Sequence, residues 1–328
     1  MSKRFVRFGD VQDAVGQRIA KLAGAPAACV TSGAAGALLI GTAGGLTGKD
    51  QEKIQRIPDL RGMKSEVIIQ KSHRFPYDHL VRNCGIKLVE VEGRAGIERA
   101  INERTAMLLF LNKADHLGEV QMKEFVEIGK QRGIPTMNDA AADVPPVENL
   151  LTPIRLGFDL VAVSGGKGIR GPQSAGILFG RPDLIEAARL NTLPYSDTIG
   201  RCCKVNKEEV VGMMVAFELF LKEDHAALYK EWNKRIALIE KQIASVKGVS
   251  CKPYTPKIAN QVPHLRVEWD EAQVKITPEQ LMQKLREGEP SIELVPGPEK
   301  GGVDICSWTL GAGEAEIVAK RVREILSA

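Results

Sequence analysis

The fold of this chain is decided by one stretch of its sequence, Phe158-Asp-Leu-Val-Ala-Val-Ser-Gly-Gly-Lys-Gly-Ile-Arg-Gly-Pro-Gln-Ser-Ala-Gly-Ile-Leu-Phe-Gly180. Two apolar runs within it, Leu160–Val163 and Ala175–Phe179, are typical of buried strands. A glycine-rich loop joins the two runs and carries one lysine, Lys167. A lysine that forms a Schiff base must be held beside its cofactor and kept partly neutral. The stretch therefore predicts a reactive lysine on a loop between two strands.

Three other interpretations of this loop are open. Gly166-x-Gly168-x-x-Gly171 matches the dinucleotide fingerprint, which requires a helix after the loop and would indicate an NAD-dependent oxidoreductase. Ser164-x-x-Lys167 matches the motif of serine acyltransferases, although no helical pattern follows the serine. The loop is also compatible with a hairpin whose lysine is incidental. A proline and an apolar run follow the loop, and they favour a strand there over a helix.

The composition is that of an ordinary globular protein. The chain has 328 residues, of which 44% are hydrophobic and 26% charged, so two domains are expected. Its net charge of +4 is too weak to indicate a nucleic-acid partner. The six cysteines show no metal-ligand spacing, and we interpret them as reduced thiols of a cytoplasmic protein without a metal. No stretch has the pattern of a signal peptide or the length of a membrane span.

Strand and helix patterns alternate along the first part of the chain. Strands are predicted at residues 27–30, 66–70, 87–91, 106–111 and 134–139, and helices at 10–22, 78–84, 96–104 and 122–132. A polar loop is predicted at residues 48–64, and Asp10 is the predicted N-cap of the first helix. The alternation favours an α/β fold with a mostly parallel sheet and right-handed crossovers.

The pattern changes near residue 205, where we place the domain boundary. Residues 1–205 are predicted to form a large domain and residues 206–328 a smaller α+β domain. Helices of the second domain are predicted at 207–221, 229–246, 277–287 and 314–326, and strands at 261–269, 291–295 and 305–310. This domain is therefore expected to have two or three strands with helices on one side.

Three further segments carry candidate functional residues. Asp139 ends a predicted strand, where α/β sheets present functional groups, and a carboxylate there would keep a pyridine nitrogen protonated. His73 also follows a strand and would stack on an aromatic cofactor. The segment Thr31–Leu38 has small residues that would let a helix N-terminus approach a phosphate, and Ser32 would add a hydroxyl.

Each of these residues also has a purely structural interpretation, which the sequence leaves open. Asp139 would serve as a helix cap, and Asp143 is a nearby alternative acid that follows the strand end. His73 would be an ordinary polar surface residue. The small residues after Ser32 would suit a tightly packed core helix.

The chain resembles the fold-type I pyridoxal-phosphate enzymes. The resemblance rests on Ser32-Gly-Ala-Ala, on Asp139 at a strand end, and on the loop Ser-Gly-Gly-Lys-Gly-x-Arg-Gly-Pro-Gln-Ser-Ala-Gly around Lys167. The branch that it matches best is similar to bacterial selenocysteine synthase (L-seryl-tRNA selenium transferase) and D-glucosaminate-6-phosphate ammonia-lyase. This implies a mostly parallel, seven-stranded-type sheet flanked by helices, with a smaller C-terminal α+β domain.

The resemblance also implies a cofactor, pyridoxal 5'-phosphate, and a role for each candidate residue. The implied roles are the phosphate cup for Ser32, Gly33 and Ala34, a further phosphate contact for Ser164, stacking on the pyridine ring for His73, the acid on the pyridine nitrogen for Asp139, and the Schiff base for Lys167. The catalytic residues are thus expected to be Lys167, Asp139 and His73.

Several features of the family are not found in this sequence. Family members usually carry some tens of residues before the first helix, and selenocysteine synthase has a separate region that grips tRNA; we expect both sets of contacts to be missing here. The C-terminal strand has no arginine that could clamp a carboxylate. Arg170, Arg61 and Arg74 are therefore the candidates for binding a substrate carboxylate or phosphate.

The resemblance implies a lyase that removes the Cα proton of a small amino acid or amino-sugar acid and then eliminates a β-substituent, giving a 2-keto acid and ammonia. A pyridoxal-phosphate-dependent transferase, of the seryl-tRNA selenium transferase or class V aminotransferase type, is the alternative, and a non-catalytic relative is a third. A small-molecule amino substrate is expected, in a homodimer or larger homo-oligomer. Neither nucleic acid nor a membrane is an expected partner.

Overall fold

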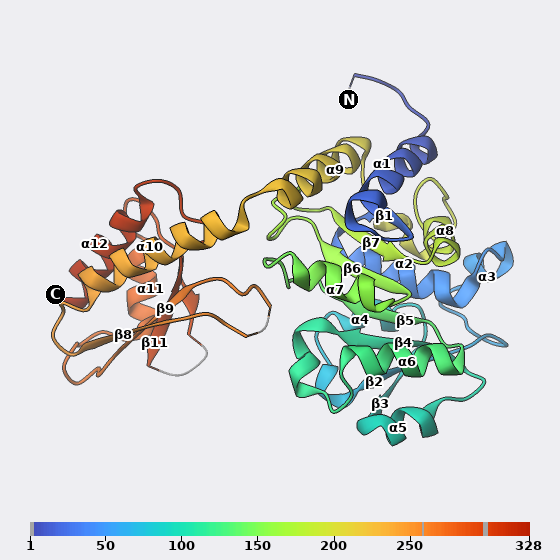
Figure 1. Cartoon of the computed structure of the whole chain (residues 1–328), viewed down its shortest axis with the longest axis horizontal. Helices are drawn as coiled ribbons and strands as arrows, with labels where there is room; N and C mark the ends of the chain where they lie inside the picture. Colours follow the sequence, from blue (N-terminus) through green and yellow to red (C-terminus); the bar gives the residue numbers. More distant parts are fainter. Residues whose placement is uncertain (1–2, 258, 298–300) are drawn as a thin grey trace. The chain divides into compact units, whose positions relative to one another are not determined.

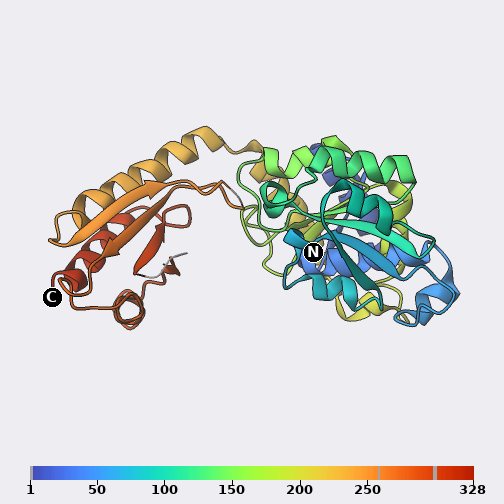
Figure 2. The same cartoon turned by 90° about the horizontal axis from the view of Figure 1, so that it is seen from below.

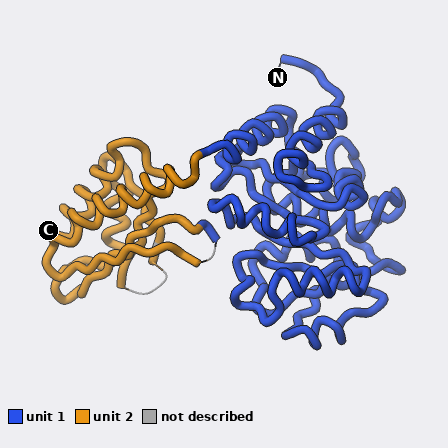
Figure 3. The backbone as a smooth tube through the Cα atoms, viewed as in Figure 1, with its two compact units in different colours: residues 1–223, 258–260 blue, residues 224–257, 261–328 orange. Residues whose placement is uncertain are grey.

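The computed structural model describes residues 3–257, 259–297 and 301–328, and the chain divides into two compact units (Figure 3). The first unit comprises Met1–Glu223 with Ile258–Asn260, and the second comprises Asp224–Lys257 with Gln261–Ala328. We expected the domain boundary near residue 205, but the main boundary in the sequence lies after residue 223.

The difference in the boundary comes from one helix, α9 (Lys207–Lys222). It packs against α1 (Phe8–Ala23), and the two helices contribute to the same hydrophobic core. Arg18 of α1 and Glu218 of α9 also form an ion pair at 2.8 Å. Helix α9 therefore belongs to the first unit, although the sequence pattern changes at its start.

The first unit is built on a seven-stranded sheet with the order β1-β7-β6-β5-β4-β2-β3 (Figure 1). Its strands are β1 (Ala27–Thr31), β2 (Glu66–Gln70), β3 (Lys87–Val91), β4 (Thr105–Leu111), β5 (Thr136–Asp139), β6 (Leu160–Ser164) and β7 (Gly176–Gly180). Strands β3, β2, β4, β5 and β6 run parallel, whereas β7 is antiparallel to both of its neighbours, β6 and β1. The mostly parallel sheet expected from the sequence is confirmed.

Burial on both faces explains the apolar sequences of the central strands. Every residue of β2, β4, β5, β6 and β7 is buried, as is usual for parallel strands between two layers of helices. One face carries α1, α5 (Gly93–Ala100), α6 (Met122–Arg132), α7 (Glu148–Leu156) and α9, and the other carries α2 (Gly33–Thr47), α4 (Asp78–Arg82) and α8 (Pro182–Leu190) (Figures 1 and 2).

The small residues of α2 allow close packing against α8. A Cβ on Gly44 would lie 2.6 Å from the backbone nitrogen of Ala188, a distance that no side chain tolerates. Most residues of α2 are buried. The interpretation of this segment as a tightly packed core helix is therefore correct, and the first turn of the same helix also contributes to the cavity described below.

Some sequence-based predictions for the first unit need correction. The loop expected at residues 48–64 contains α3 (Gln51–Arg56), whose N-cap Asp50 accepts backbone N–H groups of Glu52 and Lys53. A six-residue polar helix has too few turns to show a periodic pattern. Asp10 lies in the first turn of α1, and Arg7 is the N-cap. Helix α5 begins at Gly93 instead of residue 96, and α7 and α8 were not predicted.

The second unit has a four-stranded antiparallel sheet with the order β10-β11-β9-β8. Its elements are α10 (His225–Ile243), β8 (Val249–Tyr254), β9 (His264–Trp269), α11 (Pro278–Arg286), β10 (Val295–Pro296), β11 (Gly302–Cys306) and α12 (Glu314–Leu326). Two or three strands were expected, so β8 was missed, and β11 lies earlier than the predicted 305–310. Among the helices of the described ranges, none is long and apolar enough to cross a membrane.

A buried ion pair joins two neighbouring strands of this second sheet. Arg266 of β9 and Asp304 of β11 are less than a tenth exposed, and Nε lies 2.9 Å from Oδ1. The hydroxyl of Tyr254 on β8 donates to the other carboxylate oxygen at 2.8 Å. Removing one partner of such a pair leaves an uncompensated buried charge.

We expect Asp304→Ala to lower the free energy of unfolding of the second unit by about 3–5 kcal/mol, because the Arg266 guanidinium stays buried without its carboxylate. Urea denaturation followed by tryptophan fluorescence measures this, since all three tryptophans lie in the second unit. Glu293→Ala removes the exposed pair with Arg286 and should have little effect. Equal losses for the two variants would contradict the prediction.

Candidate active site

A cavity of about 180 Å³ opens at the carboxyl ends of the central strands of the first unit. It is lined by Gly33, Ala34, Ala35, Leu38, Tyr77, Asp139, Ala141, Ser164 and Lys167. Asp139 is the last residue of β5, Ser164 is the last of β6, and Gly33 begins α2. Ligands of open α/β sheets bind at this edge. The cavity brings together five of the ten residues that the sequence selected, namely Gly33, Ala34, Asp139, Ser164 and Lys167, and we take it as the candidate active site.

Backbone contacts fix the loop that carries Lys167. The N–H of Gly171 donates to the carbonyl of Gly165 at 2.8 Å, which closes the loop on itself. A Cβ on Gly166 would lie 2.5 Å from the Cα of Gln173, so only glycine fits there. The lysine is therefore presented by a loop with little freedom to move.

The segment after the loop decides between the alternative interpretations. It forms β7, which pairs antiparallel with β6 in the register Ser164↔Gly176. The dinucleotide fingerprint and the serine acyltransferase motif both require a helix where the structure has this hairpin, so both interpretations are wrong. The hairpin interpretation is correct for the backbone. Lys167 lines the cavity, which favours a functional lysine over an incidental one, and its role stays a prediction.

Asp139 lines the cavity although only 4% of it is exposed. Its Oδ1 accepts the N–H of Ala141 at 2.9 Å. Burial raises the pKa of this carboxyl to about 6; the charge of Asp143 adds to the rise and that of Lys167 opposes it. A buried carboxyl of this kind is stabilised by a cation placed against it. A protonated pyridine nitrogen is such a cation, so Asp139 fits the role that the resemblance implies.

Asp143, the alternative acid, is placed differently. It is buried, and its Oδ1 has no hydrogen-bond partner among the residues described. Burial raises the pKa of this carboxyl to about 6 as well. It is not one of the described residues that line the cavity. The structure therefore favours Asp139 over Asp143 as the acid that meets a ligand.

The start of α2 is suited to bind an anion. Within the described part of the chain, the side chain of the N-cap Ser32 makes no hydrogen bond to the first turn of the helix. The first N–H groups of a helix have no intrahelical partner, and the helix dipole adds positive charge there. Gly33 and Ala34 of this turn line the cavity with Ser164, in agreement with a phosphate site.

Ser32 itself points to a neighbouring recess. It lines this recess together with Gly36 and Cys203. A Cβ on Gly36 would lie 2.5 Å from the Ser32 Oγ, so glycine at that position makes room for the hydroxyl. The phosphate contact predicted for Ser32 is not tested by this arrangement and stays a prediction.

His73 is not among the described residues of the cavity, and it is not the surface histidine considered above. Its ring is fully buried and packs edge-on against Phe110, with the ring centroids 4.4 Å apart. Its Nδ1 accepts the N–H of Leu111 at 3.2 Å. Burial lowers the pKa of the imidazole to about 4, which keeps it neutral at pH 7. The stacking role predicted for His73 stays a prediction that this placement does not favour.

Tyr77 is the aromatic residue that does line the cavity. It follows β2 four residues after His73, immediately before α4, and its side chain is 61% exposed. Sequence analysis missed it, although an aromatic side chain after the same strand end was a usable signal. Tyr77 is thus a second candidate for contact with an aromatic ligand.

The three candidate substrate arginines are not among the described residues that line this cavity. Their acidic partners are Glu223 at 3.8 Å for Arg170, Asp59 at 2.5 Å for Arg61, and Asp78 and Glu90 for Arg74. Arg61 and Arg170 have largely exposed side chains, and such surface pairs are weak enough to exchange for a ligand. Binding of the substrate by these arginines stays a prediction.

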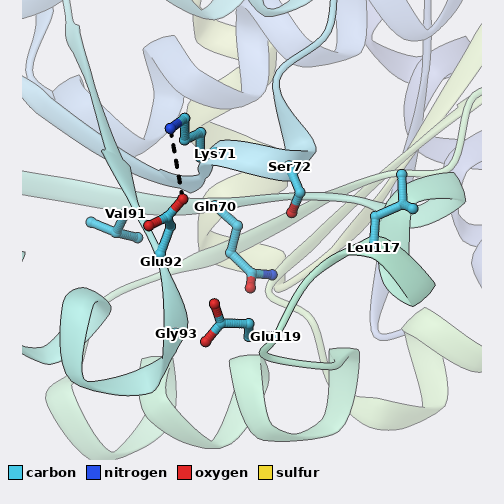
Figure 4. Close-up of a pocket in the computed structure, with 8 residues that line it drawn as sticks. All are labelled: Gln70, Lys71, Ser72, Val91, Glu92, Gly93, Leu117 and Glu119. Carbon is cyan, nitrogen blue, oxygen red and sulfur yellow. Dashed lines mark ion pairs between the residues drawn. The ribbon is translucent and has the colours of Figure 1, made fainter.

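A larger cavity of about 290 Å³ lies at the ends of β2 and β3 (Figure 4). It is lined by Gln70, Lys71, Ser72, Val91, Glu92, Gly93, Leu117 and Glu119. Its one lysine, Lys71, is already paired with Glu92 at 3.7 Å, and Glu119 adds a second carboxylate. The charge of this cavity disfavours an anionic ligand. We therefore keep the smaller cavity around Lys167 as the candidate active site.

Comparison with known proteins gives a family match and several relatives. The family model of L-seryl-tRNA selenium transferase matches residues 4–249. A 5'-C-glycyluridine monooxygenase-decarboxylase of a Streptomyces species is 28% identical over 95% of this chain and 80% of its own length. D-glucosaminate-6-phosphate ammonia lyase of Salmonella typhimurium is 26% identical over 98% of this chain and 87% of its own length. L-seryl-tRNA(Sec) selenium transferase of Mannheimia succiniciproducens is 29% identical over 64% of this chain and 46% of its own length.

Solved structures support the same family of folds. The structure of D-glucosaminate-6-phosphate ammonia-lyase superposes with a TM-score of 0.82 and 25% identity, over 99% of this chain and 88% of that one. A putative O-acetylhomoserine (thiol)-lyase of Campylobacter jejuni, which contains N'-pyridoxyl-lysine-5'-monophosphate, has a TM-score of 0.58 at 13% identity over 97% of this chain and 86% of that one. That second likeness shows the fold alone. The expected fold class, fold-type I, and the expectation of an enzyme are confirmed.

We expect Asp139→Asn to raise the free energy of unfolding of the cofactor-free protein at neutral pH by up to about 3 kcal/mol, because an amide removes the cost that a rise of the pKa from 3.8 to about 6 represents. The pKa of this carboxyl is higher in the folded chain than in the unfolded chain. The carboxyl therefore lowers the stability of the fold as the pH rises from 3.8 to about 6, and it has no such effect below pH 3.8. The gain should therefore vanish below pH 3.8.

Urea denaturation followed by circular dichroism measures this effect. Tryptophan fluorescence would not report on the first unit, because all three tryptophans lie in the second. The exposed Asp197→Asn is the control and should leave stability unchanged at every pH. A loss of stability in Asp139→Asn, or a gain that does not depend on pH, would show that burial of the charge is not costly here.

Proposed function

The chain belongs to the L-seryl-tRNA selenium transferase family, and from that premise we propose that it is a pyridoxal-phosphate-dependent lyase. The proposed reaction removes the Cα proton and a β-substituent from a small amino acid or amino-sugar acid and gives a 2-keto acid and ammonia. One observation carries the proposal: Lys167, Asp139 and the first turn of α2 line the same cavity. A relative that matches 98% of the chain and is named an ammonia lyase supports the choice of reaction.

The cavity residues fit pyridoxal phosphate at each of its three functional ends. Lys167 would hold the aldehyde, Asp139 the pyridine nitrogen, and the N–H groups of the first turn of α2, with the Ser164 hydroxyl, the phosphate. When bound, the cofactor supplies an electron sink for the charge left at Cα. Burial of Asp139 strengthens its hold on a protonated nitrogen, because an ion pair is stronger where water is excluded.

Lys167 has two proposed tasks in the reaction. Its amine would hold the aldehyde of the cofactor, and with a substrate in the site the same amine would take the Cα proton. The backbone contacts described above fix the loop from which this amine extends toward the cavity. Loss of the β-hydroxyl as water leaves an enamine, and hydrolysis of the enamine returns that water and releases ammonia.

A phosphorylated amino-sugar acid is the substrate class that we favour. The support is the name of the relative, D-glucosaminate-6-phosphate ammonia lyase, and its match along almost the whole chain. A transferase activity is the alternative, but the selenium transferase relative is matched over less than half of its length, so we propose no tRNA substrate. A homo-oligomer located in the cytoplasm stays a prediction, and light scattering would test its oligomeric state.

We expect Lys167→Ala to lose both the visible absorption band with pyridoxal phosphate and the release of ammonia from D-glucosaminate 6-phosphate, because the variant has no amine to hold the aldehyde or take the proton. Borohydride treatment of the unaltered protein should attach the cofactor to Lys167, as peptide mapping would show. Lys71→Ala, in the other cavity, is the control and should keep the band. A yellow, active Lys167→Ala variant would overturn the proposal.

We expect Tyr77→Ala to weaken pyridoxal-phosphate binding by up to about tenfold, since an aromatic contact contributes about 0.5–1.5 kcal/mol beyond burial. Tyr77→Phe keeps the ring and should bind as the parent does. Absorbance titration of the cofactor-free protein measures both affinities. Unchanged affinity in Tyr77→Ala would show that Tyr77 does not contact the cofactor.

A further inference from the structure

Two neighbouring cysteines lie beside the phosphate end of the candidate site. Cys202 ends the short helix η3 (Ile199–Cys202), Cys203 follows it, and their Sγ atoms are 3.9 Å apart. Cys202 is exposed and Cys203 is half-buried. The other four cysteines of the chain are isolated in the sequence, and the proposed lyase reaction uses none of the six.

The backbone that carries this pair is held in place. The N–H of Cys203 donates to the carbonyl of Gly200 at 3.0 Å, and the N–H of Gly200 donates to the carbonyl of Asn191 at 2.9 Å. A Cβ on Gly200 would lie 2.4 Å from that carbonyl oxygen, so the approach requires glycine. Asn191 is fully buried and donates to the Thr47 hydroxyl of α2 at 3.1 Å. The two thiols are therefore brought together before any ligand arrives.

We propose that Cys202 and Cys203 form a dithiol site for trivalent arsenicals. Thiolate sulfur binds soft ions, and an arsenic atom that bonds both sulfurs at once is held by chelation. With an arsenic(III) oxide, each thiol gives up its proton, two As–S bonds form, and the oxygen leaves with both protons as water. No electrons are transferred, so the step needs no oxidant.

The remaining cysteines do not provide a second site of this kind. Cys29 and Cys84 are buried, and burial raises the pKa of each thiol to about 12. Cys251 lies on β8 and Cys306 on β11, and β9 separates these two strands. These four thiols therefore act singly, and only the adjacent pair offers two sulfurs to one atom.

The dithiol site is linked to the cofactor site through Ser32. Cys203 and Ser32 both line the recess next to the start of α2. An arsenic atom bound to Cys202 and Cys203 draws the Cys203 sulfur toward its neighbour and adds a bulky group beside Ser32. On the basis of the proposed function and of the phosphate contact predicted for Ser32, we infer that occupancy of the dithiol weakens pyridoxal-phosphate binding by about tenfold, the cost of that one contact.

Phenylarsine oxide and the reduced full-length chain provide the test. Intact mass after gel filtration should show one phenylarsenic adduct per chain, which a dithiol such as 2,3-dimercaptopropanol removes and excess monothiol does not. Cys202→Ser and Cys203→Ser should each lose the adduct, whereas Cys251→Ser and Cys306→Ser, the matched controls on the second unit, should keep it. Circular dichroism checks that every variant is folded.

The outcomes separate the dithiol site from the proposed function. An adduct that persists in folded Cys202→Ser or Cys203→Ser, or that monothiols remove, overturns the site. An adduct on the pair that leaves pyridoxal-phosphate affinity unchanged overturns the link through Ser32. A protein that binds no pyridoxal phosphate, with or without the adduct, contradicts the proposed lyase. In that case the dithiol site is still tested by whether the adduct forms on Cys202 and Cys203.

Discussion

The close contact between β7 and the start of α2 is the constraint on which the candidate site depends. Gly176 lies so near Gly33 that a Cβ on Gly176 would be 2.5 Å from the carbonyl carbon of Gly33. Because β7 also pairs with β6 and β1, the contact ties the loop of Lys167 to the helix N-terminus. Two segments that are far apart in the sequence are thus positioned by backbone packing, which allows far less movement than contact between long side chains.

Sequence reasoning identified the sheet well because its central strands are buried on both faces. A strand such as Thr105–Leu111 is then a continuous apolar run, which local pattern analysis detects. The same reasoning missed β8, since this strand lies at a sheet edge, with half of its residues exposed, and its sequence alternates weakly. It also misplaced the domain boundary, because the partner of α9 is α1, at the other end of the unit in sequence. No local pattern reveals such a partner.

Within the site, the sequence predicted well those residues that the backbone alone places in the cavity. It predicted less well those residues whose side-chain direction depends on contacts with distant parts of the chain. Asp139 ends a strand and Lys167 lies on a closed loop, so their places follow from the sheet. His73 lies in the one-turn helix η1 (Lys71–His73), which turns its ring toward the backbone of Leu111 instead of the cavity. Ser32 lines a recess with Cys203, a residue that lies far along the chain. Such choices depend on contacts that only the fold creates.

Electrostatics connects the stability of the fold to its proposed chemistry. Asp139 and Asp143 are both buried with raised pKa values, and Lys167 provides opposing positive charge to each. Holding two buried carboxyls near one amine is costly for the cofactor-free chain. A cation bound against Asp139 removes part of that cost, and any ligand that binds only the folded state also stabilises it by mass action. The same contact that would keep a pyridine nitrogen protonated therefore also relieves an unfavourable buried charge, so cofactor binding and stability are expected to rise together.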